Sequence, residues 1–176
     1  DPDDKTVLGV RIPAGGGIED GQRVLDLLAH HPSTARFISR RLAQRFLADD
    51  PPASVVQKMA QTFTRTEGDI REVLKTMLST PEFWSEGAYR AKMKSPLEMV
   101  VSAVRALGAD VESAQGLAFK LEELGQPLYQ KEEPTGYSNT SEAWVNSTAL
   151  LARMNFAQAL AANSIPGVRV DLGRLD

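Results

Sequence analysis

The sequence predicts an all-α protein, an irregular bundle of seven to eight helices with short extended segments at the N and C termini. Two observations carry this prediction: apolar residues recur at helical spacing through most of the chain, and four helix starts carry a proline, which is favourable at the first helical position. The helices are expected near residues 21–30, 32–48, 51–66, 69–79, 81–86, 96–108, 111–124 and 147–162.

The helix starts are marked by capping residues. Four of them precede a proline: His31-Pro32, Asp50-Pro51, Thr80-Pro81 and Ser95-Pro96. Glu98 follows Ser95 by three residues, the spacing of a capping box, and Asp69 with Glu72 marks a similar, weaker start. Gly68 and Gly108 follow helical stretches and suit the left-handed conformation that ends many helices.

Apolar stripes predict which face of each helix is buried. In chain order the stripes are Phe37, Ile38, Leu42 and Phe46; Val55, Val56, Met59 and Phe63; Ile70, Val73, Leu74, Met77 and Leu78; Leu97, Val100, Val101 and Val104; and Leu150, Leu151, Met154, Ala157 and Leu160. The connections between these helices are short, so helices that follow each other in sequence are expected to pack together.

Both ends of the chain are expected to be extended. Apolar residues alternate with other residues at Leu8, Val10 and Ile12 and again at Val168, Val170 and Leu172. Alternation at period two is typical of strands. We expect the two segments to pair with each other or with chain outside this sequence; the alternative is two solvated tails.

The sequence is expected to form a single helical domain over residues 1–176. Its parts are an extended, glycine-rich stretch at 1–20, a helical core at 21–124, an aromatic and polar loop at 125–146, a last helix at 147–163 and an extended tail at 164–176. A chain of this length buries roughly 70% of the surface that its unfolded form exposes, enough for a core without staples. The first residue is Asp1 and not methionine, so we expect a fragment of a longer protein.

Composition narrows the function classes. No apolar run reaches the ~18 residues of a membrane span, so membrane insertion is not expected. The net charge of −3 is too close to neutral to indicate nucleic acid as a partner. His30 and His31 are the two histidines, and neighbouring helical positions point about 100° apart, so we expect no metal site. No catalytic or cofactor motif is present, and no cofactor is expected.

Several short motifs follow one another along the chain. They are His31-Pro32-Ser33-Thr34-Ala35-Arg36-Phe37-Ile38, Asp49-Asp50-Pro51-Pro52, Gly68-Asp69-Ile70-Arg71, Thr80-Pro81-Glu82-Phe83-Trp84, Lys94-Ser95-Pro96-Leu97-Glu98, Leu124-Gly125-Gln126-Pro127-Leu128, Gly136-Tyr137, Trp144 and Leu151-Ala152-Arg153-Met154-Asn155-Phe156. In this order they resemble a bacterial family called domain of unknown function 1800. The resemblance implies a longer protein with a large N-terminal portion and an exported, periplasmic or secreted setting. It supplies no catalytic residue.

Four arginines on the predicted helix 32–48 require anionic neighbours. Arg36 with Arg40, and Arg41 with Arg45, are like-charge pairs four residues apart, each destabilising by a few tenths of a kcal/mol. Carboxylates or helix-end carbonyls of the chain itself are the first explanation. The alternatives are an acidic patch on the remainder of the protein and a small anionic molecule. Arg36 and Arg40 are therefore candidate binding residues.

The loop at 125–146 gathers aromatic and amide side chains. Gln126, Tyr129, Tyr137 and Trp144 offer stacking faces and hydrogen bonds that suit a glycan or a peptide. The alternative is that the aromatic residues fold back and anchor a long connection.

These observations favour a helical module of an exported bacterial protein that packs against the rest of its own chain and mediates assembly or ligand binding. The expected partners are the remainder of the full-length chain and a glycan or peptide. The first alternative is one wall of an enzyme site that the missing N-terminal portion completes, with polysaccharides as the candidate substrate class. The second alternative is a nucleic-acid-binding helical domain, which the charge disfavours.

Overall fold

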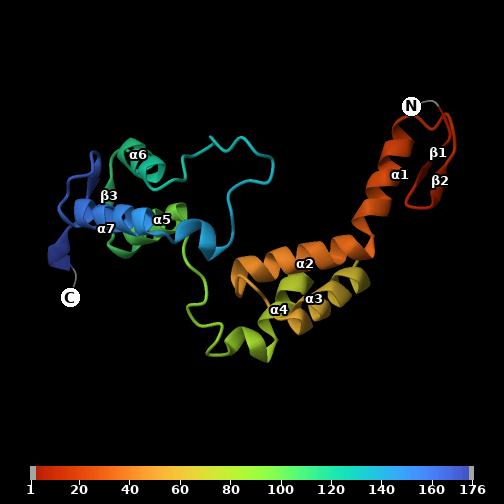
Figure 1. The fold of residues 1–176 in the computed structure, drawn as a ribbon, viewed down its shortest axis with the longest axis horizontal. Coiled ribbons are helices and arrows are strands. Elements are labelled where there is room, and N and C mark those ends of the chain that lie inside the picture. The colour runs from red at the N-terminus through yellow and green to blue at the C-terminus, as the bar shows by residue number, and fades with distance from the viewer. Residues whose placement is uncertain (1–2, 175–176) are drawn as a thin grey trace. The chain divides into compact units, whose positions relative to one another are not determined.

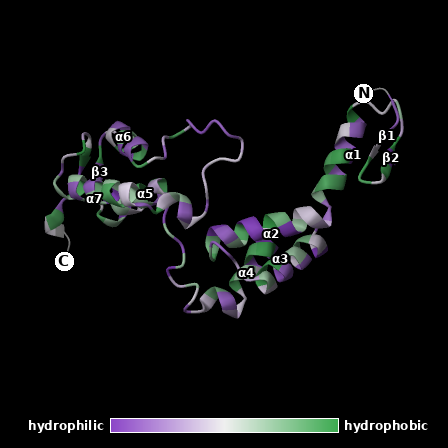
Figure 2. Ribbon diagram, in the orientation of Figure 1, coloured by the Kyte–Doolittle hydropathy of each residue, from purple (hydrophilic) through white to green (hydrophobic). Residues whose placement is uncertain are grey.

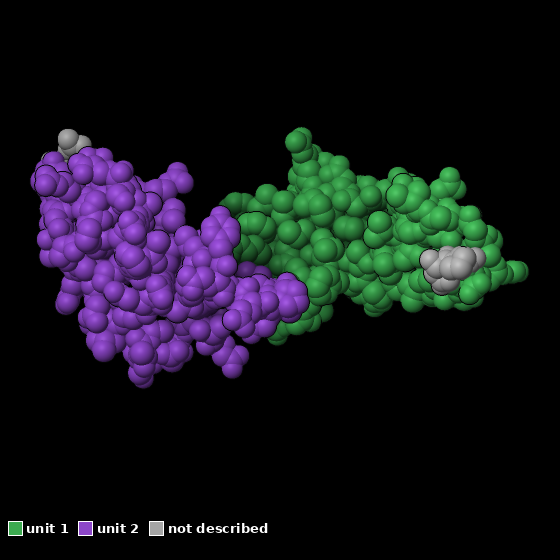
Figure 3. Space-filling view, turned by 90° about the horizontal axis from the view of Figure 1, so that it is seen from above, with its two compact units in different colours: residues 1–91 green, residues 92–176 purple. Residues whose placement is uncertain are grey.

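The structure, a computed structural model, describes residues 3–174 and divides into two compact units, residues 1–91 and 92–176 (Figures 1 and 3). The described residues form seven α-helices, four short strands and three short 3₁₀ helices, so the predicted mainly helical fold with extended ends is confirmed. Each unit has a hydrophobic core of its own. Whether the two act as the single domain expected for residues 1–176 stays a prediction.

Unit 1 begins with a β-hairpin. Strand β1 (Lys5–Val7) pairs antiparallel with β2 (Val10–Ile12). Leu8 and Gly9 both have positive φ, 48° and 82°, the backbone that a tight two-residue hairpin turn requires. This turn folds the chain back onto β1, so the predicted pairing of this segment with residues 168–172 is wrong. Residues 1–2 and 175–176 of the predicted ends lie outside the described part of the chain.

Helix α1 (Ile18–Ala29) follows the hairpin, and an ion pair connects the two elements. The ammonium group of Lys5 donates to the carboxylate of Asp20 at 2.9 Å, and the Asp20 side chain is buried. Asp4 accepts hydrogen bonds from the Arg11 side chain and, at 2.6 Å, from the backbone N–H of Ala14. These contacts close the hairpin and fix it to the start of α1.

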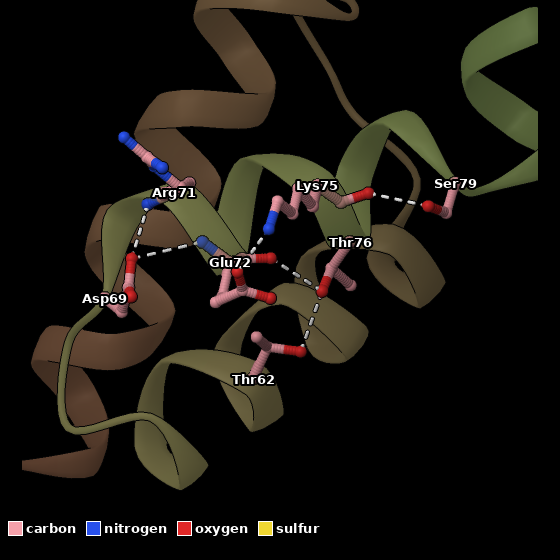
Figure 4. A network of polar contacts seen from close by, with 7 residues as sticks. All are labelled: Thr62, Asp69, Arg71, Glu72, Lys75, Thr76 and Ser79. Carbon is pink, nitrogen blue, oxygen red and sulfur yellow. Dashed lines mark hydrogen bonds and ion pairs between the residues drawn. The ribbon is translucent and has the colours of Figure 1, made fainter.

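The core of unit 1 is built by α2 (Pro32–Phe46), α3 (Ala53–Arg65) and α4 (Ile70–Leu78), followed by the 3₁₀ helix η1 (Pro81–Trp84). The buried cluster consists of Ala35, Ala43, Leu47, Val55, Met59, Ala60, Phe63, Val73 and Met77. Figure 4 shows the polar contacts around α4, where Asp69 caps the helix and the hydroxyl groups of Thr62 and Thr76 lie 2.9 Å apart. The predicted caps at His31 and Asp69 are confirmed.

The start of α3 differs from the prediction. The expected start at Pro51 moves to Ala53, with Pro52 at the N-cap in an extended conformation (ψ 132°). A residue that precedes a proline is pushed out of the helical region, so Pro51 cannot begin a helix before Pro52.

Helix α2 buries the predicted stripe only in part: Ile38 and Leu42 are half-buried and pack against the core, but the two aromatic residues do not lie in it. Ala35, Ser39 and Ala43 are buried, whereas Phe37 and Phe46 are 63% and 51% exposed. Small side chains four residues apart allow two helices to approach closely, so packing on α3 favours this stripe over the aromatic one. Figure 2 shows hydrophilic and hydrophobic residues alternating along α2.

Unit 2 packs α5 (Pro96–Ala106), α6 (Gln115–Glu123) and α7 (Ser147–Ala161) around a second core. The buried cluster contains Val100, Leu121, Leu124, Phe156, Leu160, Ile165, Val168 and Val170. The predicted capping box of Ser95 and Glu98 is confirmed. The loop before α7 contains a 3₁₀ helix, η2 (Ser141–Trp144), and the described chain ends with η3 (Leu172–Arg174).

The C-terminal segment pairs within unit 2. Strand β4 (Val168–Arg169) pairs antiparallel with β3 (Asp110–Val111). The helix predicted over 111–124 is shorter than expected, because Val111 belongs to β3 and α6 begins only at Gln115.

Helix α7 turns a different face inward from the one predicted. Phe156 and Leu160 are buried, whereas Leu150, Leu151 and Met154 are 46%, 58% and 61% exposed. The predicted stripe is therefore wrong except at Leu160, because apolar residues surround most of α7 and only one side of the helix meets the core.

Candidate functional site

An open groove of about 930 Å³ lies in unit 1, between the first half of α2 and the length of α3. The turn that joins the two helices contributes to it. The lining residues are Pro32, Ala35, Arg36, Arg40, Asp50, Pro51, Pro52, Ala53, Val56, Gln57, Ala60, Gln61, Thr64 and Arg65. We call this feature the α2–α3 groove.

The floor of the groove is apolar and made of small side chains. Ala35 on α2 and Ala60 on α3 are 3% and 8% exposed, and Val56 is half-buried beside them. Alanine at both positions leaves space above the floor that larger residues would fill. The groove therefore results from the same small residues that allow α2 and α3 to pack closely.

Polar side chains follow both edges of the groove. Arg36 and Arg40 lie four residues apart on α2, and Gln57, Gln61 and Arg65 follow at the same spacing on α3. Residues four apart lie on one face of a helix. Two rows of hydrogen-bond donors therefore border an apolar floor.

The charges in the groove are only partly balanced. The guanidinium of Arg40 lies 3.6 Å from the carboxylate of Asp50, and both side chains are well exposed, at 60% and 94%, so solvent screens the pair. Arg65 donates one long hydrogen bond of 3.4 Å to the hydroxyl of Thr62. Three cations and one carboxylate leave the groove with surplus positive charge.

Arg36 is the least satisfied of these side chains. It is exposed and makes no hydrogen bond or ion pair with any residue between 3 and 174. Arg41, on the same helix, is also exposed but does not line the groove. An intramolecular carboxylate, the first explanation for the arginines, is thus present for Arg40 and missing for Arg36 within the described residues.

The predicted loop residues lie in unit 2, and three of the four make hydrogen bonds that hold the loop. Gln126 is buried, and its side-chain oxygen accepts a hydrogen bond of 2.8 Å from the backbone N–H of Leu97 at the start of α5. This bond anchors the beginning of the 125–146 loop on the helix. The amide is therefore engaged in structure.

Two of the three aromatic residues in the loop fold back on it. Tyr137 donates its hydroxyl to the carbonyl of Pro127 at 2.7 Å, and Trp144 donates its indole N–H to the carbonyl of Ser138 at 3.0 Å. Their ring centroids lie 6.1 Å apart, and Trp144 is buried. Tyr129 is instead fully exposed, with a φ of 59°. Ligand contact at the six predicted residues stays a prediction.

Sequence reasoning found one edge of the groove and missed the other. Arg36 and Arg40 were identified from their like charge at a spacing of four. Polar residues with the same spacing of four occur at Gln57, Gln61 and Arg65, beside the correctly predicted stripe of α3. This spacing is the sequence signal for the second edge. It marks a groove only when α2 packs beside α3, and the sequence of α3 does not specify which helix packs there.

The described residues contain neither a cluster of metal ligands nor a membrane-spanning helix. Between residues 3 and 174, no group of three or more histidine, aspartate or glutamate side chains could hold a metal ion. Within the same residues, none of the helices combines the length and apolar content that crossing a membrane requires.

One of three comparisons with known proteins found a match, and it supports the family resemblance of the sequence motifs. No curated protein and no solved structure matches the chain. A family model described as protein of unknown function, DUF1800, matches residues 1–175, nearly the whole chain. The chain therefore belongs to the DUF1800 family.

Proposed function

We propose that this chain is a helical docking module whose α2–α3 groove binds an acidic, partly apolar polypeptide segment. The observation that carries the proposal is Arg36, a cation without a partner among the described residues at the edge of an apolar groove. Such a groove matches the recognition mode in which a segment inserts apolar side chains between two helices and polar contacts fix its position.

The length of the groove favours a segment over a metabolite. Lining residues run from Ala53 to Arg65, the full 13 residues of α3, which corresponds to about 20 Å of helix. The apolar floor at Ala35 and Ala60 suits small apolar side chains. The amides of Gln57 and Gln61 suit main-chain groups of an extended or helical segment.

The two α2 arginines favour carboxylates. A guanidinium offers forked donors that match a carboxylate, and hydrogen bonds to charged groups contribute about 1.5–3 kcal/mol. An acidic side chain between Arg36 and Arg40 would also relieve the repulsion between these neighbouring cations. Binding is therefore expected to depend on the charge of the segment.

The remainder of the full-length protein is the partner we propose first. Docking against its own chain would make the module an assembly element, as the sequence suggested. The exported setting implied by the family resemblance belongs to the same proposal, because both rest on the longer protein that the resemblance implies.

The proposal is tested with labelled peptides and two variants of α2. Fluorescence anisotropy would follow the binding of a 15-residue helical peptide with glutamate at spacings of four beside alanine and leucine. We expect Arg36→Ala to weaken binding by about tenfold, the loss of one charge-assisted contact. Arg41→Ala removes the same charge from the same helix outside the groove and serves as the control.

Three results would count against the proposal. The first is an equal loss of affinity in the Arg36 and Arg41 variants, which would indicate attraction by net charge alone. The second is equal binding of the peptide with glutamine in place of every glutamate. The third is no binding of the acidic peptide by the unchanged chain. Circular dichroism of both variants verifies that α2 remains folded.

A second candidate, one wall of an enzyme site, is favoured by the volume of the groove. About 930 Å³ lies at the upper end of the range for small-molecule sites. In this alternative Arg36 and Arg40 would hold an anionic sugar. Hexagalacturonate and the neutral chitohexaose are suitable probes in the same assay, and binding of hexagalacturonate without binding of the acidic peptide would favour the wall.

A further inference from the structure

We propose that the α2–α3 groove also binds helix α1 of a second copy of this chain, so that each of two copies docks its α1 into the groove of the other. The inference rests on the proposed function, because it uses the same groove and the same preference for an acidic, partly apolar segment. Helix α1 has this chemistry, and one of its faces is uncovered among the described residues. Its 12 residues are close in number to the 13 residues of α3 along which the groove runs.

The outer face of α1 is apolar and exposed. Ile18, Leu25 and Leu28 are 81%, 67% and 43% exposed, and their spacing of seven and three residues places them on one side of the helix. A different side carries Asp20, which is buried and paired with Lys5 of the hairpin. Among the described residues, those that form the buried cluster of unit 1 or pack against it include none from α1. The core of unit 1 therefore leaves the outer face of α1 open.

An acidic edge borders this apolar face. Glu19 and Asp26 lie seven residues apart, on the same side of α1 and beside the apolar residues. Both are exposed, and neither side chain makes a hydrogen bond or ion pair with a residue between 3 and 174. Two carboxylates without partners on α1 thus match the surplus positive charge of the groove, where Arg36 lacks a partner in the same part of the chain.

Charge is distributed in the same one-sided way on the groove and on the helix. The α2 edge of the groove carries Arg36 and Arg40, whereas amides make up most of the polar α3 edge. The apolar face of α1 likewise has carboxylates along one edge and the half-buried Val24 along the other. We therefore expect the acidic edge of α1 to lie along the α2 edge, with its leucine side chains above the small floor residues Ala35 and Ala60. A neutral or basic helix would lack this charge match.

A second copy supplies the helix because α1 of the same copy is held outside the groove. The hydroxyl of Thr34 on α2 donates to the carbonyl of Leu28 at the end of α1 at 2.6 Å, and His31 caps α2 directly after it. None of the lining residues of the groove belongs to α1. Each copy offers one groove and one helix, so mutual docking closes a two-fold pair in which every contact occurs twice.

The proposal is tested by exchanging one charge on each side of the contact. Sedimentation equilibrium of the unchanged chain should show a monomer–dimer equilibrium, and Arg36→Glu or Asp26→Lys should each raise the dissociation constant at least about tenfold because like charges then meet at both contacts. An equimolar mixture of the two variants should associate again, because the new charges attract each other at one contact and the other contact is unchanged. Acidic residues near the start of α2 and basic residues in the last turn of α1 suit the helix dipoles, so both variants are expected to stay folded.

Two control variants make the same charge changes elsewhere. Arg41→Glu lies on α2 outside the groove and Glu112→Lys lies in unit 2, and neither should change the dissociation constant. A chain that stays monomeric at millimolar concentration, controls as disruptive as the test variants, or a mixture that associates no better than its components would overturn this inference. A monomeric chain that binds the acidic peptide would overturn the pairing of copies alone, whereas a chain that does not bind the peptide would overturn the proposed function.

Discussion

Several polar side chains of this protein form hydrogen bonds with its own backbone. Asp69 and His31 cap helices, and Gln126 holds the start of a loop. Asn163 bonds both backbone groups of Val170, accepting from its N–H at 2.6 Å and donating to its carbonyl at 2.9 Å. Arg36 differs from these because it has no hydrogen-bond or ion-pair partner among the described residues and also lines the α2–α3 groove. The combination of these two properties is the reason why we assign it to a ligand.

Asn163 offers a test of these backbone contacts. Asn163→Ala should lower the free energy of unfolding of unit 2 by about 1–3 kcal/mol, because two backbone groups of Val170 lose their partner. Asn163 also has a φ of 54°, which alanine tolerates less well. Urea denaturation followed by circular dichroism measures the change, with the exposed Asn155→Ala as the control. A change below about 0.5 kcal/mol would contradict the role of Asn163.

Asp4 gives the hairpin a dependence on pH. The side chain of Arg11 first, and the backbone N–H of Ala14 second, lower the pKa of Asp4 from its ordinary value of 3.8. A carboxylate with a lowered pKa in the folded state stabilises the fold above its unfolded pKa, and this stabilisation is lost as pH falls through the folded value. We therefore expect the hairpin to loosen only below about pH 3.8. The amide resonance of Ala14 would report it in an NMR titration, and Asp4→Asn should remove the transition.

At the scale of helices and strands, the sequence predicted the bounds of the helices better than it predicted which face of each helix is buried. Capping residues and proline act locally, so the bounds of most helices were close to those observed. The buried face depends on the neighbouring element, and α2 and α7 each carry apolar residues on more than one face. The two end segments were extended as expected, but their partners are β1 and β3, which their own alternation does not reveal.

The stripe of α2 can be tested by exchanging sizes. Ala43 is fully buried, so Ala43→Leu should overpack the contact between α2 and α3 and lower the free energy of unfolding by about 1–3 kcal/mol. Phe37→Ala should change it by less than about 0.5 kcal/mol because Phe37 is mainly exposed. Urea denaturation of both variants distinguishes the two faces. The reverse order of effects would support the aromatic stripe that the sequence predicted.

At the scale of the whole molecule, the chain divides into two compact units with separate cores, and whether they act as the single domain expected over residues 1–176 stays a prediction. The candidate site follows this division. Arg36 and Arg40 belong to unit 1 and line one groove, whereas Gln126, Tyr137 and Trp144 belong to unit 2 and hold one loop together. The charge pattern identified the first group, and in the second group Tyr137 and Trp144 make hydrogen bonds within the loop.

The division into units leads to a prediction about folding. Because each unit has its own buried cluster, residues 1–91 and 92–176 should each keep helical circular dichroism and a cooperative thermal transition when they are produced separately. The full chain provides the reference. Loss of structure in either half would instead support the single domain predicted from the sequence.

A double-mutant cycle measures most directly whether Arg36 recognises a carboxylate in the α2–α3 groove. The cycle combines the unchanged chain and Arg36→Ala with the acidic peptide and its glutamate-to-glutamine counterpart in four anisotropy titrations. We predict a coupling free energy of about 1.5 kcal/mol between Arg36 and the peptide carboxylates, with Arg41→Ala giving less than about 0.3 kcal/mol in the same cycle. A coupling of zero at Arg36, or an equal coupling at Arg41, would contradict the account.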